Sequence, residues 1–459
     1  MGLYGDLNLG YKGFINLHVT GRNDWVSTLY PENRSFFYPS VDLAFSPMEL
    51  FPELKNNKVL SSLKLRGGWS KVGQVNLPGG AGFGAYQLEP TFSQQNGYPF
   101  TATGGGFGLN NTIVSSSLKP EITKGWEAGF DANFLKNRIR TNFSWYSTKT
   151  SDQTVTASIS SASGFTSYLL NAALTNSIGI EATVNAVVIR KKDIELTVGA
   201  VFTDIIENNV LAISEGIEAL SFGSGVSAVR GQPFPVIFAT SYKRDPQNRI
   251  IVDPITGYPS RNDGNTVLGR TNPKNTLGLN FNLTYKNFSL SAQAEYRGGN
   301  VTYMNNTTAF DFSGGGLATV AFNRERFVFP NSSIPDPNKP GEFLPNTNIT
   351  VRDGGYGFWT QSPRTGVAEN YVASGAFWKM REITLGYELP QQLMSKIRFI
   401  KKAMITLQGR NLFMLLPKTN LYTDPEYSDN GAASNGVGVA GIASPPPSRY
   451  YGATISLTF

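Results

Sequence analysis

Residues 450–459 alternate apolar side chains with small or polar ones up to a terminal phenylalanine. Side chains on a β-strand point alternately to opposite faces, so this pattern predicts a strand with one apolar and one polar face. The apolar positions are Tyr451, Ala453, Ile455, Leu457 and Phe459. Such a strand fits a half-buried sheet of a soluble protein or a barrel wall between lipid and water. The number of times the pattern recurs must decide between them.

The alternation recurs in pairs of segments that read as hairpins. Residues 277–285 and 288–296 both alternate and are separated only by Lys286-Asn287, which predicts a tight turn. Residues 126–134 and 139–145 form a second such pair, and residues 178–186 and 194–202 form a third. Aromatic side chains gather toward the ends of these segments, as the interfacial girdle of a membrane barrel requires.

Residues 1–459 divide into about thirteen expected strands joined by alternately short and long connections. The expected strands are residues 3–11, 14–22, 36–46, 59–72, 122–134, 138–150, 174–188, 194–206, 273–285, 288–298, 376–389, 403–415 and 450–459. The long connections are residues 23–35, 73–121, 151–173, 207–272, 299–375 and 416–449. Short turns on one side and long loops on the other are typical of outer-membrane barrels, whose turns are periplasmic and whose loops are extracellular. The sequence therefore predicts an all-β, antiparallel transmembrane barrel in the outer membrane.

Composition agrees with this fold class and argues against several others. The 459 residues include no cysteine and one histidine, only 16% are charged, and the mean hydropathy is −0.20. No run of residues approaches the roughly 18 apolar positions of a spanning helix. The net charge of +7 comes from lysines and arginines scattered among turns and loops, so nucleic acid is not an expected partner.

The strand count predicts that residues 1–459 are one C-terminal portion of a larger barrel. Single-chain bacterial barrels have an even number of strands, and open strand edges in lipid would leave backbone groups unpaired. The residues after Met1 do not read as a signal peptide. We therefore expect the remaining strands upstream of Met1.

Nine short motifs follow one another along the chain and carry a family resemblance. They are Gly21-Arg22-Asn23-Asp24-Trp25, Phe37-Tyr38-Pro39-Ser40, Leu65-Arg66-Gly67-Gly68-Trp69, Leu118-Lys119-Pro120-Glu121, Gly179-Ile180-Glu181, Gly231-Gln232-Pro233, Phe377-Trp378-Lys379-Met380-Arg381, Gly409-Arg410-Asn411-Leu412-Phe413 and Asp424-Pro425-Glu426. In the order and spacing of these motifs, the chain resembles the C-terminal barrel region of the SusC/RagA-like TonB-linked outer-membrane importers of Bacteroidetes. The resemblance covers essentially the whole chain.

The resemblance implies a fold, partners and a mechanism. Family members look like 22-stranded barrels, so the plug domain, the TonB-contacting segment and the N-terminal extension would lie outside this chain. The implied partners are a SusD-like surface lipoprotein acting as a lid, the TonB complex through the missing N-terminal region, and the lipid of the outer membrane. The implied substrates are oligosaccharides or peptides, and no cofactor is implied.

Side chains in the two last long loops are the candidates for ligand or partner contact. Rigid aromatic rings stack on sugar faces, and charged groups fix the orientation of a ligand. The candidates are Tyr356, Phe358, Trp359, Arg364, Tyr371, Tyr422, Asp424 and Glu426. The alternative is that these side chains pack the loops together or touch the lid protein. For Asp424 and Glu426, which flank Pro425, a loop-shaping or cation-binding role is favoured over a pair of hydrolytic carboxylates.

Nothing in the sequence indicates an enzyme or a metal site. His18, the single histidine, alternates with Asn16 and Thr20 on the expected lumenal face and lacks other histidines or cysteines as partners. The favoured interpretation is therefore part of an outer-membrane importer of oligomeric nutrients. A passive porin-like channel and a secreted β-rich glycan-binding protein are the alternatives.

Overall fold

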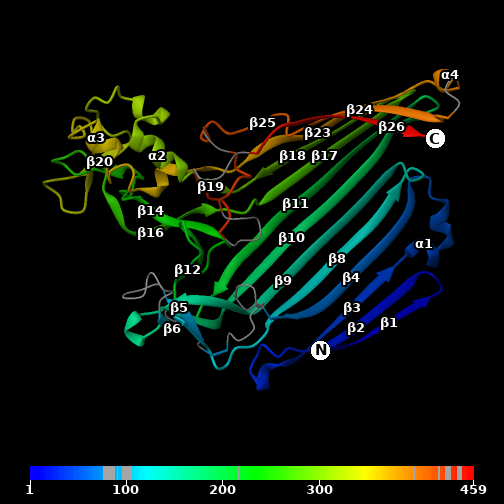
Figure 1. Ribbon diagram of the computed structural model, residues 1–459, viewed down its shortest axis with the longest axis horizontal. Helices are drawn as coiled ribbons and strands as arrows, with labels where there is room; N and C mark the ends of the chain where they lie inside the picture. The colour runs from blue at the N-terminus through cyan, green and yellow to red at the C-terminus, as the bar shows by residue number, and fades with distance from the viewer. Residues whose placement is uncertain are drawn as a thin grey trace. The chain divides into compact units, whose positions relative to one another are not determined.

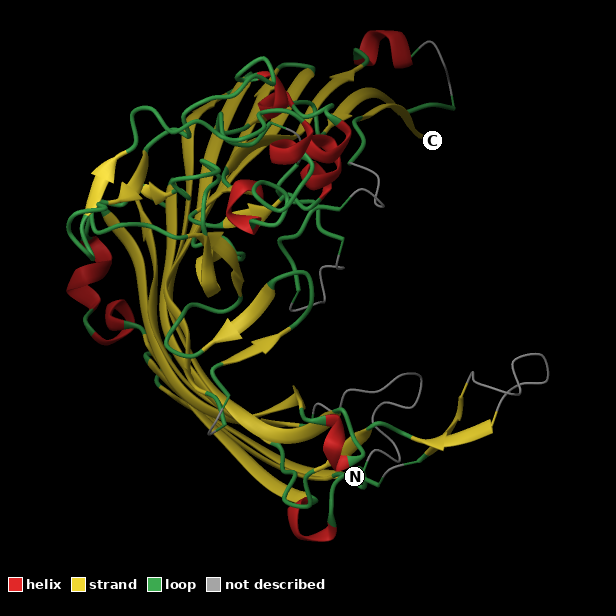
Figure 2. Cartoon of the chain, turned by 90° about the vertical axis from the view of Figure 1, so that its left-hand side faces the viewer, coloured by secondary structure: helices red, strands yellow, loops and turns green. Residues whose placement is uncertain are grey.

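The computed structural model describes residues 1–75, 88–89, 91–95, 106–214, 217–395, 399–421, 424–429, 436–441 and 447–459. These residues form two compact units. Unit 1 comprises residues 1–220 and 230–232, and unit 2 comprises residues 221–229 and 233–459. Strands dominate both units, and the helices are short (Figure 2). Among the described helices, none is long and apolar enough to cross a membrane.

Unit 1 is an antiparallel sheet in which each long strand pairs with the next long strand along the chain (Figure 1). Its strands, in spatial order, are β1 (Gly2–Tyr11), β2 (Ile15–Trp25), β3 (Ser35–Phe45), β4 (Leu60–Gln74), β8 (Glu121–Phe134), β9 (Ile139–Ser158), β10 (Ser167–Lys191) and β11 (Ile194–Ala212). The turn between β1 and β2 is tight because Lys12 and Gly13 both take positive φ values, of 46° and 74°.

Two neighbouring rows of side chains show how the alternation of the sequence becomes two faces of the unit 1 sheet. One row runs through Leu7, Val19, Val41, Trp69 and Trp126. The adjacent row runs through Asn8, His18, Asp42, Gly68 and Glu127. Paired residues of an antiparallel sheet share a face, so the first row belongs to an apolar face of the sheet and the second row to a polar face.

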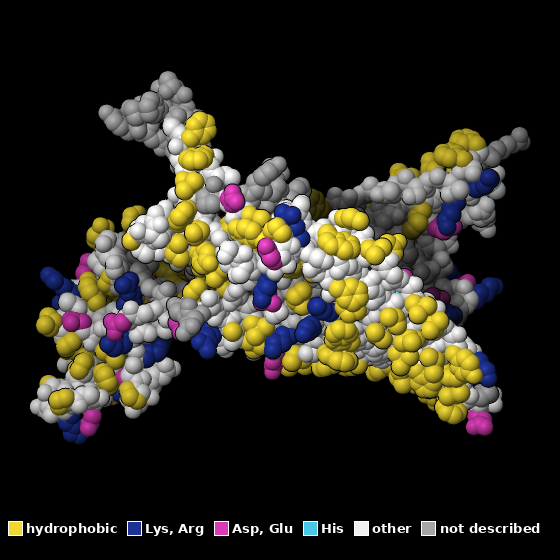
Figure 3. Space-filling view, turned by 90° about the horizontal axis from the view of Figure 1, so that it is seen from below, with side chains coloured by type: hydrophobic (Ala, Val, Ile, Leu, Met, Phe, Trp, Pro, Cys, Tyr) yellow, Lys and Arg dark blue, Asp and Glu magenta, His cyan; other side chains and the backbone are white. Residues whose placement is uncertain are grey.

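The apolar side chains of this sheet are partly exposed rather than covered by other protein elements. Leu7, Val41, Leu65 and Trp126 are each at least 40% exposed. The space-filling view shows apolar side chains gathered in a broad patch with few charged groups (Figure 3). A monomeric soluble protein rarely exposes so many large apolar groups together, and a lipid-facing wall requires them.

The connections of unit 1 contain short elements and a small core of their own. The elements are η1 (Pro31–Asn33), α1 (Pro47–Leu50), η2 (Pro52–Asn56), β5 (Phe92–Gln95), β6 (Gly106–Leu109), β7 (Thr112–Val114) and η3 (Ser161–Ser163). Strand β7 pairs in parallel with the start of β10, while β5 and β6 form a hairpin. Leu29, Leu118 and Leu169 are buried together. Strand β12 (Ala219–Ser221) spans the boundary between the units in sequence.

Unit 2 contains long antiparallel strands of the same kind. Its long strands, in spatial order, are β17 (Asn275–Tyr285), β18 (Phe288–Gly298), β23 (Phe377–Glu388), β24 (Lys402–Arg410) and β26 (Tyr450–Thr458). One row of paired residues is apolar throughout: Leu283, Leu290, Leu385, Leu407 and Ala453. The adjacent row is small and polar: Thr284, Ser289, Gly386, Thr406 and Thr454. The alternation of the last strand therefore continues across four neighbours.

The long connections of unit 2 are folded rather than irregular. Their elements are β13 (Val226–Val229), β14 (Val236–Tyr242), β15 (Ile250–Ile251), β16 (Arg261–Arg270), β19 (Val301–Tyr303), α2 (Asn306–Ser313), η4 (Leu317–Val320), β20 (Ser332–Pro335), β21 (Phe343–Pro345), α3 (Tyr356–Trp359), η5 (Ala368–Tyr371), β22 (Val372–Ser374), α4 (Gln391–Met394) and β25 (Met414–Leu415). β13, β14 and β16 form one small sheet, and β15, β20 and β21 form another.

The structure confirms the all-β, antiparallel fold and the three expected hairpins, which are β17–β18, β8–β9 and β10–β11. One expected strand, residues 403–415, is divided in two. β24 ends at Arg410 because Asn411 takes a positive φ of 52°, and β25 then pairs separately with β23. The loops expected at 151–173 and 207–272 are shorter than predicted, because β9, β10 and β11 extend into them.

Candidate functional site

The polar face of unit 1 carries a network of charged side chains centred on Arg66. Its Nη1 donates a hydrogen bond of 2.6 Å to Glu127 Oε1, and Nη2 donates to Ser144 Oγ. The Nε atom lies 3.8 Å from Asp131 Oδ2. Strands β4, β8 and β9 position these groups, because each contributes a polar residue to the same face of the sheet. Arg66 thereby links three strands across the wall.

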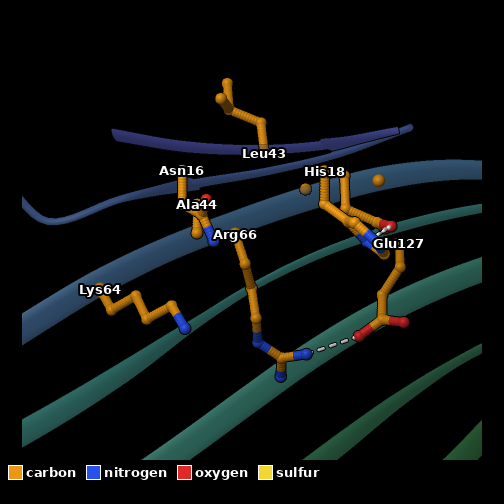
Figure 4. Close-up of a pocket in the computed structure, with 10 residues that line it drawn as sticks. Asn16, His18, Leu43, Ala44, Lys64, Arg66 and Glu127 are labelled. Carbon is orange, nitrogen blue, oxygen red and sulfur yellow. Dashed lines mark hydrogen bonds and ion pairs between the residues drawn. The ribbon is translucent and has the colours of Figure 1, made fainter. Parts of the chain in front are cut away.

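A pocket of about 190 Å³ opens beside Arg66 on this face (Figure 4). His18 lies in its wall, with Nε2 donating to Asp6 Oδ2 over 2.8 Å and Nδ1 3.5 Å from Asp42 Oδ2. Lys64 also lines the pocket. Within the described part of the chain, no group of three or more His, Cys, Asp or Glu side chains is arranged to hold a metal ion.

The aromatic candidates of the longest loop divide between a buried and an exposed position. Phe358 and Trp359 are 2% and 6% exposed and pack with Phe327 and Val351 in a loop core. Tyr356, at the start of the same short helix α3, is 71% exposed. In this conformation Phe358 and Trp359 hold the loop together, which is the alternative role that the sequence left open. Tyr356 alone of these three offers a free ring to a ligand or a partner.

Arg364 and Tyr371 meet at the buried carboxylate of Asp311. Arg364 Nε donates to Asp311 Oδ2 over 2.9 Å, and the Tyr371 hydroxyl donates to the same oxygen over 3.0 Å. Arg364 also donates to Asn370 and lies over the rings of Trp359 and Tyr371. Burial, followed by the charge of Asp311, raises the pKa of Tyr371 above its ordinary value. The phenol therefore stays protonated and donates to the carboxylate at every physiological pH.

Asp424 and Glu426 join a strand-end ion cluster, which consists of Glu295, Arg297, Lys379, Arg381, Asp424 and Glu426. Lys379, only 3% exposed, donates hydrogen bonds of 2.7 Å to both Asp424 Oδ2 and Glu426 Oε2. Arg381 donates to both oxygens of Glu426 over 2.6 and 2.5 Å, and Arg297 Nη2 lies 3.3 Å from Glu426 Oε1. The two carboxylates thus fix the last loop to the ends of β18 and β23. Tyr422 lies outside the described residues.

The pKa of Glu426 reflects these cations. Burial alone would raise the pKa, but the hydrogen bonds and charges of Arg381 and Lys379 outweigh burial and lower it to about 2 from an ordinary 4.5. A carboxylate whose folded pKa is depressed stabilises the fold above its unfolded pKa, and that stability is lost as the pH falls through the folded pKa.

We therefore expect the loop around Glu426 to loosen as the pH falls from about 4.5 to 2. Pepsin digestion followed by mass spectrometry should show cleavage near Glu426 accelerating over this range, relative to cleavage at the exposed β21 segment of the same chain. In a Glu426→Gln variant the group cannot titrate, so the acceleration should be absent. An equal acceleration in that variant would contradict the assignment.

The comparisons with known proteins agree with this geometry. A family model described as "TonB dependent receptor-like, beta-barrel" matches residues 1–412. This chain belongs to that TonB-dependent receptor family. Its members are outer-membrane β-barrel proteins, which accounts for the exposed apolar rows of the receptor chain's strands.

Two curated relatives and one solved structure resemble this receptor chain. TonB-dependent receptor P26 of Formosa agariphila is 25% identical over 95% of the chain, which covers 43% of that protein. TonB-dependent receptor SusC of Bacteroides thetaiotaomicron is 31% identical over 41% of the chain, covering 19% of SusC. The structure of the RagAB peptide transporter matches the whole chain with a TM-score of 0.75 at 20% identity, covering 47% of that structure's chain. The receptor chain therefore spans less than half the length of each of these three proteins. These matches also confirm that it is SusC/RagA-like.

Sequence reasoning did not assign roles to several residues of these networks. Lys379 and Arg381 were recognised only as parts of a family motif, although each of the pairs Lys379–Arg381 and Glu295–Arg297 has the spacing of two that puts side chains on one face of a regular strand. That shared spacing was the available signal. No such signal marked Asp311, because it is a single acidic residue in a polar loop. Its partner, Arg364, lies 53 residues away in sequence.

Proposed function

We propose that this chain forms the C-terminal portion of the barrel of an outer-membrane, TonB-dependent importer. The importer takes up oligomeric nutrients, either oligosaccharides or peptides, and works with a SusD-like lipoprotein lid and with TonB through segments outside this chain. The chain itself is not an enzyme. The observation that carries the proposal is the match of residues 1–412 to the receptor barrel family.

Further support comes from the surfaces of the long strands in each unit. The apolar rows, including Ala453, Ile455 and Leu457 of β26, suit contact with lipid, whereas the rows beside them suit a wet lumen. Tyr451 and Phe459 would belong to the same lipid-facing side. The relatives are named as receptors, and one structural neighbour is described as a peptide transporter. A peptide is therefore as acceptable a substrate class here as an oligosaccharide.

Among the candidate loop residues, we propose a graded set of roles. Tyr356 is exposed and is the best placed to touch a ligand or the lid. Arg364 and Tyr371 position the loop through Asp311, and Phe358 and Trp359 form its core. Asp424 and Glu426 hold the last loop against the wall.

Uptake in the native bacterium tests the proposed function. A strain lacking the gene should lose uptake of a fluorescent oligosaccharide or oligopeptide that the parent strain takes up, and re-expression of the full-length protein should restore it. Dissipating the proton gradient or deleting TonB should abolish uptake in the complemented strain. A SusD-like lipoprotein should co-purify with the receptor from the outer membrane.

The same measurements separate the alternatives. Uptake that continues without TonB would identify a passive porin-like channel. Ligand binding without uptake, by a protein recovered from the culture medium, would identify a secreted glycan-binding protein. Either result would overturn the importer proposal.

A further inference from the structure

The carboxylate of Glu426 sits in a binding site built from three cations. Arg381 contacts both carboxylate oxygens, Lys379 contacts Oε2 at 2.7 Å, and Arg297 approaches Oε1 at 3.3 Å. A planar guanidinium that donates two parallel hydrogen bonds is the arrangement with which proteins recognise carboxylate groups. The last loop thus supplies the anion for a site whose cations all come from β18 and β23.

The cations would remain paired if Glu426 left this site. Lys379 also binds Asp424, and both Arg297 and Arg381 bind Glu295, at 2.5 Å each. Removing Glu426 therefore leaves no buried cation without a counter-ion. Only an unpaired buried cation would make the departure of the Glu426 side chain costly. The side chain of Glu426 is also 27% exposed, against 3% for Lys379. Glu426 is also the most exposed of the three carboxylates of the cluster, since Asp424 is 10% and Glu295 is 17% exposed.

An open pocket of about 400 Å³ leads to the same arginine. Its wall includes Arg381 and Arg410, together with Gln408, Asn411 and Tyr450. Among the described residues that line this pocket, none is acidic. Arg410 is 58% exposed and uses Nε to bind Glu382, and its terminal nitrogens make no hydrogen bond within the described part of the chain. Guanidinium, amide and phenol groups together favour an oligomer that carries carboxylate groups.

We propose that the cations around Glu426 form a recognition site for a substrate carboxylate, which Glu426 occupies when no substrate is bound. An acidic substrate enters through the pocket at Arg410, its carboxylate replaces that of Glu426 on Arg381, and residues 424–429 are released from the ends of β18 and β23. Glu426 is therefore an internal competitor of the ligand. The proposal rests on the proposed function, because it defines the substrate class of the importer.

Binding measurements on the full-length receptor at neutral pH test this competition. The acidic ligands are trigalacturonate and triglutamate, which represent a sugar source and a peptide source of the carboxylate. Their neutral counterparts are methyl-esterified trigalacturonate and triglutamine. Replacing Glu426 with glutamine keeps the shape of the side chain and removes its charge, so at least one acidic ligand should bind about ten-fold more tightly. The neutral counterparts should bind with unchanged affinity.

A matched control and a second variant keep the test decisive. Glu342→Gln removes an exposed carboxylate that, among the described residues, forms an ion pair with Lys339 alone, and it should change no affinity. Arg410→Gln alters an exposed pocket residue, so it should fold normally and weaken binding of the acidic ligand about ten-fold. Tighter binding of trigalacturonate or of triglutamate identifies the source, and both results support the site.

Other outcomes overturn the proposal. If Glu426→Gln binds neither acidic ligand more tightly than the native receptor, or tightens the neutral ligands equally, Glu426 is not a competitor. If the Glu426→Gln variant fails to fold, the Arg410→Gln variant decides: an affinity for the acidic ligands equal to that of the native receptor would also overturn the proposal. Uptake that depends on TonB in the native strain would persist in each of these cases, so failure of this site is distinguishable from failure of the proposed function.

Discussion

Replacing Lys379 with methionine should lower the free energy of unfolding of unit 2 by about 3–5 kcal/mol. Methionine matches the length of the side chain but leaves Asp424 and Glu426 beside a strand end without the ammonium that binds both. Removing one partner of a buried ion cluster lowers the free energy of unfolding by more than the whole cluster adds to it. The remaining charges are still desolvated but have lost their partner. Denaturant titration of the detergent-solubilised receptor, followed by tryptophan fluorescence, measures the change.

A second substitution distinguishes charge imbalance from lost packing. Adding Asp424→Asn to Lys379→Met removes one of the stranded charges, so the double variant should recover part of the lost stability. A double variant that is less stable than Lys379→Met would mean that packing of the lysine stem, and not its charge, accounts for the effect.

Replacing Arg364 with leucine should destabilise the loop region of unit 2 by a similar amount, about 3–5 kcal/mol. Asp311 is 4% exposed, and Oδ2 of its carboxylate would retain only the hydroxyl of Tyr371 as a partner among the described residues. The variant also loses the stacking of the guanidinium on Trp359. Because Trp359 is buried in the loop core, loosening should shift its fluorescence toward longer wavelengths at lower denaturant concentration.

Tyr371→Phe is the matched comparison for this prediction. It removes one hydrogen bond to Asp311 but keeps the ring and the ion pair, so it should cost only about 1–2 kcal/mol. If Tyr371→Phe and Arg364→Leu cost the same, the buried charge of Asp311 is not the main determinant of loop stability.

The sequence predicted the strands well because strand pairing in this chain follows a local rule. Leu283, Leu290, Leu385 and Leu407 can each be assigned to the apolar face from their immediate neighbours, since side chains alternate with a period of two. The turn at Lys286-Asn287 is equally local. The break at Asn411 was missed, because only a change of backbone φ at one residue separates β24 from β25.

The loop residues could not be assigned in this way. Phe358 carries no periodic signal, and its burial depends on Phe327 and Val351, which come from other parts of the loop. An aromatic ring suits a ligand contact and a core contact equally well, so composition alone leaves both roles open. The carboxylates of the last loop were expected to shape the loop or bind a cation. The cation that both of them bind is a lysine of the chain itself, Lys379, which lies 45 and 47 residues earlier in sequence.

The two-residue alternation of β24 also limits how the chain can change in length. Inserting one residue between Ile405 and Thr406 would reverse every later side chain of the strand, turning Arg410 toward the apolar side and Leu407 toward water. Inserting the same residue in the connection before β23 would leave every pairing of the sheet intact. Insertions and deletions of single residues should therefore accumulate in the loops during evolution. Relatives of this chain can then acquire new ligand specificities while the strands of the wall keep their length.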